Sequence, residues 1–390
     1  NIHVDYLLSD FGKPLYSDLQ YCKRCCMPET NMGIKFDDMG ICQACQSSEQ
    51  KIHINWKERE KELKKIFEKR KNESENNYDC IMGISGGKDS TKQALTARDR
   101  LGLNCLLVNN EPEGITDIGK HNIENLKNLG FDVISIRPNP IKIKKMIKRD
   151  FFKYLNPVKI TEYALWSCTY IIAEKFDIPL IIQGENGGLT LGTSLTGLGT
   201  DDNALKANEM DTMSSGWEEY LEIEGIDEKD LFLFHYDRKK LEEMKIRGIW
   251  LQYFLKEWSF TGNAEFAREN GLKWRENFNP EDIGTYSAFS QLDSDFVQVN
   301  QMLKYIKFGF GQCMDHVCYN LRENTMTREE AIDLVKKYDG KCSDLYIKKF
   351  CDYIDISENE FWETVNKFRG SMWKKNTDDT WHNTYLDIIK

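Results

Sequence analysis

Residues 79–90, DCIMGISGGKDS, join an apolar run directly to a glycine pair and the sequence Lys-Asp-Ser. The run Cys80–Ile84 has the length and β-branched character of a buried strand, and the two glycines permit backbone angles that a side chain would forbid. Consecutive N–H groups of a glycine-rich turn that opens onto a helix N-terminus attract anions. We therefore expect a phosphate-binding turn between this strand and a helix that begins near Thr91.

From Tyr78 onward, short apolar strands alternate with helical stretches, which is typical of a parallel sheet with crossover helices. The expected strands are Cys80–Ile84, 105–109, 133–136 and Leu180–Gln183, and the expected helices between them include 91–101, 118–129 and 161–176. Ligands of such open sheets lie beyond the carboxyl ends of the strands. The sequence places SGGKDS, NNEPEG and GENGG there, so we expect these three loops to converge on one crevice.

Four cysteines near the start, Cys22, Cys25, Cys42 and Cys45, follow the spacing C-x2-C-x16-C-x2-C. This spacing, with turn-forming residues between the two pairs, predicts a zinc ribbon. Because sulfur would fill all four positions, the metal would be structural and would have no open site for catalysis. The alternative is four unrelated buried cysteines. Cys26 is a fifth thiol beside the site and is not expected to be a ligand.

The composition limits the class of protein. The chain has 390 residues, a net charge of −10, a mean hydropathy of −0.59 and twelve cysteines. We expect a globular protein of two or three domains without membrane insertion, located in the cytoplasm, whose cysteines are thiols or metal ligands. Nucleic-acid binding is driven largely by Lys and Arg, so the acidic balance argues against a nucleic-acid partner.

The domains are expected in a fixed order along the chain. We predict a zinc ribbon over 1–50, a connecting amphipathic helix over 51–77, an α/β domain over 78–235 and a mainly α-helical region over 236–390. The Gly- and Thr-rich segment 184–202 is expected to be a mobile loop, which is either a lid over a site or an ordinary flexible connection.

The glycine turn is neither the Walker form nor the dinucleotide fingerprint, and it resembles the PP-loop of the ATP pyrophosphatases. That family splits ATP between its α and β phosphates and transfers AMP to an oxygen of the substrate. The resemblance implies a sheet of the PP-loop type that binds ATP and Mg²⁺. The expected phosphate-binding residues are Ser85, Gly86, Gly87, Lys88, Asp89 and Ser90. Of these, Lys88 adds positive charge, and Asp89 could help to hold magnesium. A chance SGGKDS in a surface turn is the alternative.

Two further loops have expected roles in such a site. In the family the second strand edge meets adenine, which points to Val108, Asn109 and Asn110, although a plain turn would also use Asn-Asn. The motif GEN after the strand Leu180–Gln183 comprises Gly184, Glu185 and Asn186. We assign Gly184 to the nucleotide site, and Glu185 and Asn186 to magnesium or the substrate. A Gly-Glu-Asn turn could instead cap a helix.

Over nearly its full length the chain is similar to the N-acetyl sugar amidotransferases. The similarity rests on the cysteine ribbon, SGGKDS, TDIGKHNIENLKNLGFDVI, GEN, GTYSAFSQLD, YIKFGFGQCMDH, MTREEAIDLVKKYDGK and FCDYIDISENEFW. It implies conversion of an acetamido group into an acetamidino group on a pseudaminic, legionaminic or mannuronic acid derivative of a bacterial surface polysaccharide or flagellin glycan. ATP would adenylylate the amide oxygen, and ammonia would then displace AMP. Where the family has an EYGG-like element after GEN, this chain has GGLTLG, so we expect either the substrate contacts or the lid to differ from those of the family.

We expect Lys88, Asp89 and Glu185 to be the catalytic residues. Asp315 and His316 are candidates to contact a polar sugar, and Arg322 is a candidate to pair with its carboxylate. A solvated helix surface is the alternative for these last three.

The chain shows no sign of its own ammonia source. GQCMD at 311–315 lacks the second glycine of a G-x-C-x-G nucleophile elbow, so no glutaminase is expected in this chain. The resemblance implies either a separate glutaminase subunit or direct use of ammonium.

A tRNA-modifying PP-loop enzyme of the thiolation or lysidine type is the main alternative function, although the chain is acidic and Cys80 lies inside an expected strand. A non-enzymatic zinc-ribbon module is the third hypothesis, and the intact loop argues against it.

Overall fold

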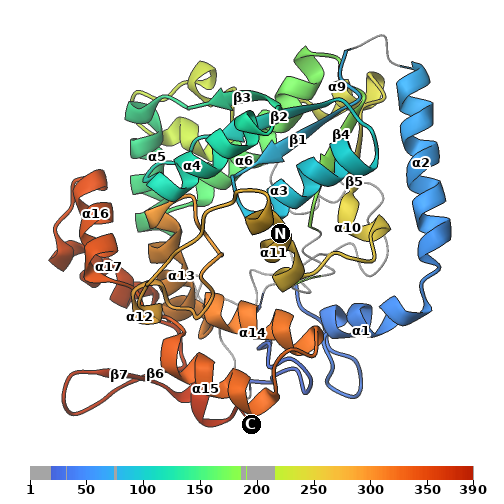
Figure 1. The fold of residues 1–390 in the computed structure, drawn as a ribbon. Coiled ribbons are helices and arrows are strands. Elements are labelled where there is room, and N and C mark those ends of the chain that lie inside the picture. The colour runs from blue at the N-terminus through green and yellow to red at the C-terminus, as the bar shows by residue number, and fades with distance from the viewer. Residues whose placement is uncertain (1–18, 32, 74–76, 186–189, 191–215, 390) are drawn as a thin grey trace.

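The computed structural model describes residues 19–31, 33–73, 77–185, 190 and 216–389. Its centre is a five-stranded sheet with the order β3-β2-β1-β4-β5, in which every pairing is parallel. Helices cover both faces of this sheet, and the helices of the C-terminal third lie together beside one end of it (Figure 1). The expected α/β fold with a four-cysteine cluster near the N-terminus and a helical C-terminal region is confirmed.

The strands follow the expected apolar runs closely. The bounds are β1 Cys80–Ile84, β2 Cys105–Asn110, β3 Asp132–Ile136, β4 Leu180–Gln183 and β5 Arg247–Trp250. Side chains alternate between the faces of β1: Ile81 belongs to the core with α5 and α6, whereas Met82 and Ile84 belong to the core with α2, α3 and α4. The fifth strand was missed, so the sheet extends beyond the predicted domain limit at 235. Its four residues are too few to show the alternation of apolar and polar residues that indicates a strand, and aromatic residues follow it directly.

The crossover helices lie at or near the expected positions. Their bounds are α3 Lys88–Leu95, continued by a π-helical turn η3 Thr96–Arg100, then α4 Asp117–Asn128, α5 Pro140–Tyr154 and α6 Lys159–Lys175. Helix α5 was not expected from the sequence, although its start carries a clear signal. Asn139 caps its first turn by accepting from the backbone of Ile141, and Pro140 occupies the first helical position.

The N-terminal elements connect the cysteine cluster to the sheet. They are α1 Gln43–Gln50, the short 3₁₀ helix η2 Lys51–His53 and the long helix α2 Trp56–Glu73. The connecting helix α2 buries Leu63, Ile66 and Phe67 in the same core cluster as Met82 and Ile84 of β1, as expected for an amphipathic helix.

The remaining elements form the C-terminal part. Short elements come first: η4 Trp217–Glu222, η5 Glu228–Leu231, α9 Arg238–Glu243 and α10 Leu251–Phe254. Longer helices follow: α11 Phe260–Glu269, α12 Pro280–Ile283, α13 Asp295–Phe308, α14 Gln312–Arg322, α15 Arg328–Tyr338, α16 Asp344–Ile354 and α17 Glu358–Phe368. The chain ends with an antiparallel pair, β6 Trp373–Lys375 and β7 Trp381–Asn383, and a 3₁₀ turn η6 Thr384–Asp387. No helix in the described ranges is both long and apolar enough to span a bilayer.

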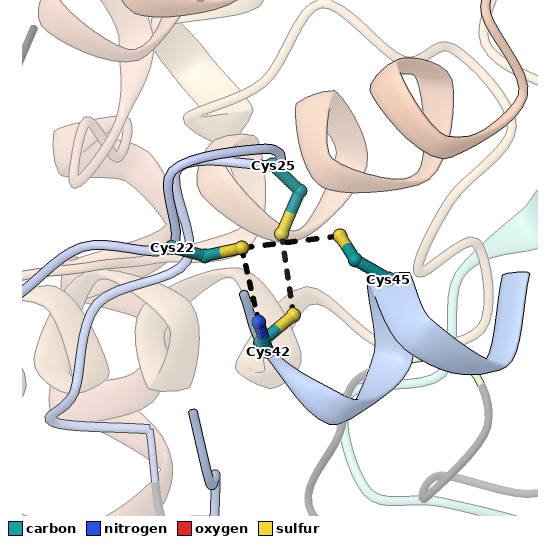
Figure 2. Close-up of side chains that lie close together, drawn as sticks. All are labelled: Cys22, Cys25, Cys42 and Cys45. Carbon is teal, nitrogen blue, oxygen red and sulfur yellow. Dashed lines mark hydrogen bonds between the residues drawn. The ribbon is translucent and has the colours of Figure 1, made fainter. Parts of the chain in front are cut away.

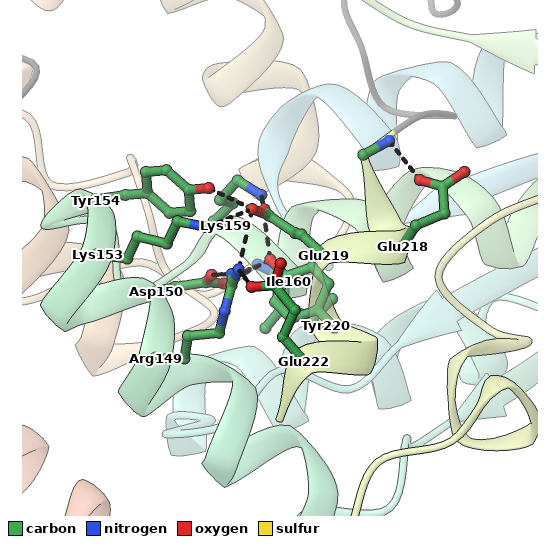
Figure 3. A network of polar contacts seen from close by, with 11 residues as sticks. Arg149, Asp150, Lys153, Tyr154, Lys159, Ile160, Glu218, Glu219, Tyr220 and Glu222 are labelled. Carbon is green, nitrogen blue, oxygen red and sulfur yellow. Dashed lines mark hydrogen bonds and ion pairs between the residues drawn. The ribbon is translucent and has the colours of Figure 1, made fainter. Parts of the chain in front are cut away.

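A buried polar network joins α5, α6 and η4 (Figure 3). The side chain of Asp150 is fully buried, and it accepts from the Tyr220 hydroxyl at 2.7 Å and from the Ile160 backbone at 3.2 Å. Glu219 forms ion pairs with Arg149 at 3.1 Å and Lys159 at 2.5 Å. These contacts link η4 to two helices that cover one face of the sheet.

Candidate functional site

The glycine turn lies at the carboxyl end of β1, and α3 begins directly after it at Lys88. Gly86 has a φ of +75°, and a Cβ there would lie 3.1 Å from Cβ of Asn122 and 3.2 Å from Cδ1 of Ile123 on α4. Both the backbone conformation and the close approach of α4 therefore require glycine. The hydroxyl of Ser90 donates to the Gly87 carbonyl at 3.1 Å, which tightens the first turn of the helix.

Two charged side chains of the loop are held by α11. Lys88 is 9% exposed, forms an ion pair with Asp89 and lies 4.8 Å above the ring of Phe260. The other carboxylate oxygen of Asp89 accepts from the amide of Asn263 at 2.8 Å. Phe260 and Asn263 were not identified from the sequence, because they lie more than 170 residues away and belong to no motif.

Glu185 follows β4 and faces the same region. Its carboxylate accepts from the hydroxyl of Tyr319 on α14 at 3.3 Å. Burial raises the pKa of Glu185, and the nearby negative charge of Asp89 raises it further. Gly184 must be glycine, because a Cβ there would lie 2.8 Å from Oε1 of Gln93 and 2.8 Å from the ring of Trp258. Asn186 and most of the segment 184–202 lie outside the described residues.

Three cavities meet at Asp89 and Glu185, which line all of them. The sheet cavity, of about 480 Å³, is also lined by Gly83, Ser85, Ser90, Gln93, Trp166, Thr169, Gly184 and Trp250. The α14 cavity, of about 200 Å³, is also lined by Ser85, Gly87, Lys88, Phe260, Ser290, Gln291, Asp293, His316 and Tyr319. The α1 cavity, of about 50 Å³, is also lined by Ser48, Lys51, Lys88, Trp258, Phe260, Tyr319, Arg322 and Glu323. The glycine loop and the GEN loop therefore border a common space.

The sheet cavity has an aromatic wall. Trp166 on α6 and Trp250 at the end of β5 pack edge to face, with their ring centroids 6.0 Å apart. Neither was identified from the sequence. Aromatic residues in a helical stretch usually belong to the core, and only the position of β5 beside β4 brings Trp250 to this cavity.

The structure brings His316 to these cavities but not Asp315. His316 Nδ1 lies 2.6 Å from the Thr285 hydroxyl, and burial, with a further contribution from Lys88, lowers the pKa of His316 to about 3. The imidazole is therefore neutral near pH 7. Asp315 lines none of the three cavities and is paired instead with Lys304 at 2.7 Å.

The residues expected to meet adenine also lie away from the cavities. Asn109 and Asn110 are 3% and 4% exposed at the end of β2, and neither they nor Val108 line any of the three. The expected convergence of three loops therefore holds for SGGKDS and GEN only. The reason is topological: the sheet cavity opens where β1 lies beside β4, whereas β2 lies on the other side of β1.

The four cysteines form one cluster (Figure 2), as their spacing predicted. All are buried, and their sulfur atoms lie within 4.8 Å of one another, with Cys25 and Cys42 at 3.6 Å and Cys22 and Cys45 at 3.9 Å. A tetrahedral zinc with Zn–S bonds of about 2.3 Å places its sulfurs about 3.8 Å apart, so the geometry fits zinc. The described part of the ribbon has two isolated antiparallel bridges, Tyr21 to Pro28 and Phe36 to Cys42.

The cysteine cluster packs directly against α14. The thiol of Cys318 on α14 donates to the carbonyl of Cys25. Ser48 on α1 donates to the carbonyl of Arg322 at 3.4 Å. A structural metal there would therefore hold α1 beside the cavities.

Comparisons with known proteins give a partial match to a family model and distant matches to solved structures. Residues 283–387 match a family model described as LPS biosynthesis protein WbpG-like, C-terminal domain. This region contains Thr285, His316, Tyr319 and Arg322. NMN synthetase from Francisella tularensis has a TM-score of 0.28 and 14% identity, over 58% of this chain and 100% of that one, which is too distant to carry an argument. No curated protein matches the chain.

Proposed function

We propose that this protein is an ATP-dependent, AMP-forming amidotransferase. It adenylylates the acetamido oxygen of a bacterial surface-glycan sugar and replaces that oxygen with ammonia-derived nitrogen. One observation carries the proposal: a loop of the PP-loop type borders a space where three cavities meet, so that two substrates can approach one another there. The similarity of residues 283–387 to an LPS biosynthesis protein supports a glycan pathway.

We place ATP in the sheet cavity. Its volume of about 480 Å³ lies within the range of about 300–1,000 Å³ found for small-molecule sites. It opens on Ser85 and Ser90 at the point where the strand order changes direction, and open α/β sheets bind their ligands at such points. The rings of Trp166 and Trp250 offer an apolar surface for the base.

Asp89 and Glu185 are suited to hold Mg²⁺. Both are carboxylates that line all three cavities, and the charge of Asp89 contributes to the raised pKa of Glu185. Hard divalent cations prefer such oxygen ligands. When bound, the metal would neutralise the charge of the departing pyrophosphate. Lys88 supplies a fixed positive charge beside the same position.

The reaction balances without a covalent enzyme intermediate. The amide oxygen attacks the α-phosphorus, the bond from that phosphorus to the bridging oxygen breaks, and pyrophosphate leaves. Ammonia then attacks the amide carbon, the C–O bond to AMP breaks, and loss of protons gives the amidine. The chain's residues would position the two substrates and stabilise charge, with the acceptor in the α14 and α1 cavities.

The ammonia is proposed to come from a separate glutaminase subunit or from free ammonium. Cys313, the cysteine of the GQCMD segment, is buried in α14 and its thiol donates to the carbonyl of Leu334 at 3.5 Å. Burial raises its pKa well above the usual range. These surroundings do not favour a thiolate nucleophile.

The test is incubation of the purified protein with ATP, Mg²⁺, ammonium and a panel of acetamido sugars, followed by mass spectrometry and nucleotide chromatography. The expected result is a sugar about one mass unit lighter, because NH replaces O, together with AMP and pyrophosphate. ADP as the nucleotide product, or modification of added tRNA alone, would overturn the proposal. Nothing in the described residues favours the tRNA alternative: the thiols of Cys80 and Cys105, 3.5 Å apart, lie at the strand ends opposite the loop.

A further inference from the structure

We propose that Lys51 and Arg322 form a subsite for an anionic group of the acceptor, a carboxylate or a phosphate, in the α1 cavity. The identity of the ligand as the acceptor rests on the proposed function, whereas the anion-binding property rests on the cavity alone. With about 50 Å³, the cavity has room for a small group, since one water needs about 10–15 Å³.

Arg322 lines this cavity and has an unused donor. The residue is 8% exposed, and its Nη2 donates to the carbonyl of Thr190. Its Nη1 is buried and has no hydrogen-bond partner within the described ranges. A buried charged donor without a partner is costly, so an oxygen of a ligand would be strongly favoured there.

Lys51 supplies a second cation. It is the first residue of η2, directly after α1, and it lines the same cavity as Arg322. Among the residues that the structure describes, its amino group has no ion pair or hydrogen bond. Burial lowers the pKa of Lys51, and the positive charge of Arg322 lowers it further. The negative charge of Glu323 acts in the opposite direction and raises this pKa.

The acidic groups around the cavity already have partners. Glu323 accepts from the backbone N–H of Phe260. Asp89 is engaged by Lys88 and Asn263, and Glu185 accepts from Tyr319. The cavity therefore has two cations with unused donors, and an anion would satisfy both.

The cysteine cluster places the two cations side by side. Cys45 and Ser48 lie on α1, which begins directly after Cys42, and η2 continues from that helix. Ser48 donates to the Arg322 carbonyl at 3.4 Å, which ties α1 to the end of α14. If Arg322 served only as a counter-charge for the nearby cysteine thiolates, Lys51 would have no role in the cavity.

The experiment is calorimetric titration of the full chain, saturated with Mg²⁺ and α,β-methylene-ATP. The probes are N-acetylglucosamine, which is neutral, N-acetylneuraminic acid, which carries a carboxylate, and N-acetylglucosamine 1-phosphate. We expect at least one anionic probe to bind about tenfold more tightly than the neutral one, and Lys51→Met to remove most of that difference. Which anionic probe responds distinguishes carboxylate from phosphate. Lys57→Met, on an exposed position of α2, is the matched control and should bind as the wild type.

Equal affinity for neutral and anionic probes, absence of binding by both anionic probes, or an unchanged Lys51→Met variant would overturn the subsite. Affinity for the ATP analogue should change less than about twofold in Lys51→Met, because Lys51 does not line the sheet cavity. The proposed function can fail separately. If Lys51-dependent anion binding is found but no AMP forms with any acetamido sugar, the subsite stands and the reaction does not.

Discussion

Two buried charge clusters lie in this protein, and they differ in what surrounds them. In the structural network of Figure 3, Asp150 and Glu219 are held by cations and donors from neighbouring helices. In the loop cluster, Asp89 and Glu185 face three cavities, and Arg322 keeps an unused donor. Both contain carboxyl groups with raised pKa values. A shifted pKa alone therefore does not identify a reactive site, and neither does an unused donor, since Nη1 of Arg149 in the structural network also has no hydrogen-bond partner within the described ranges. The open space beside the carboxylates distinguishes the loop cluster.

The largest expected effect belongs to the loop cluster. Lys88→Met keeps the apolar stem beside Phe260 but removes the charge next to Asp89. We expect AMP formation to fall by about 10²–10³-fold, as for loss of one stabilising donor, with an unchanged circular dichroism spectrum. Chromatography of AMP under saturating ATP measures it. Retention of more than a tenth of the wild-type rate would remove Lys88 from the mechanism.

The second effect concerns the cysteine cluster, from which α1 extends to the wall of the α1 cavity. In Cys42→Ser one of four thiolate ligands is lost, so we expect bound zinc, measured by plasma mass spectrometry, to fall by about tenfold. Cys26→Ser is the matched control, because this neighbouring thiol is not part of the cluster and should leave the zinc content unchanged. Full zinc content in Cys42→Ser would contradict the four-ligand assignment.

The parts of the site that could be predicted are those encoded locally. The run Cys80–Ile84 and the glycine pair after it carry both a strand period and a turn signal, and the cysteine spacing identified all four members of the cluster. The GEN loop could be placed because it follows an apolar strand of the same sheet.

The walls of the cavities could not be predicted, because distant elements build them. Asn263 and Tyr319 reach the loop carboxylates from α11 and α14, and nothing in the local sequence pairs those helices with the loop. Asp315 and His316 are neighbours in the sequence, but only His316 lines a cavity, because consecutive side chains of a helix point in different directions. Which side chain lines a cavity depends on its direction from the helix and on tertiary packing, and a short sequence motif specifies neither.

A third prediction tests the structural network. Glu219→Gln removes the carboxylate that pairs with Arg149 and Lys159 and leaves both cations with a weaker partner. We expect a loss of about 2–3 kcal/mol in the free energy of unfolding, below the 3–5 typical of fully buried pairs because Glu219 is partly exposed. Urea denaturation measures it, and AMP formation by the folded variant should equal that of the wild type. A lower rate at unchanged stability would mean that this network is also part of the active site.

The smallest effect is a change in pH dependence. Burial raises the pKa of Asp150 from 3.8 to about 7, despite opposing contributions from Lys159 and Tyr220. Between about pH 4 and pH 7 the unfolded chain releases this proton while the folded protein retains it, so the stability from this group is full below pH 4 and is lost as pH rises toward 7. The shift corresponds to at most about 4 kcal/mol, and structural relaxation should leave about 1–2 kcal/mol of it. The amide in the Asp150→Asn variant cannot ionise. Between about pH 4 and pH 7, the unfolding free energy of this variant should therefore fall less than that of the wild type. Urea denaturation at pH 5 and pH 8 measures this change in unfolding free energy for both proteins. If the change is the same in the wild type and in Asp150→Asn, Asp150 is ionised in the folded protein, and Arg149 and Lys159 offset its burial fully. The two clusters would then be alike in charge and would differ only in their access to the cavities.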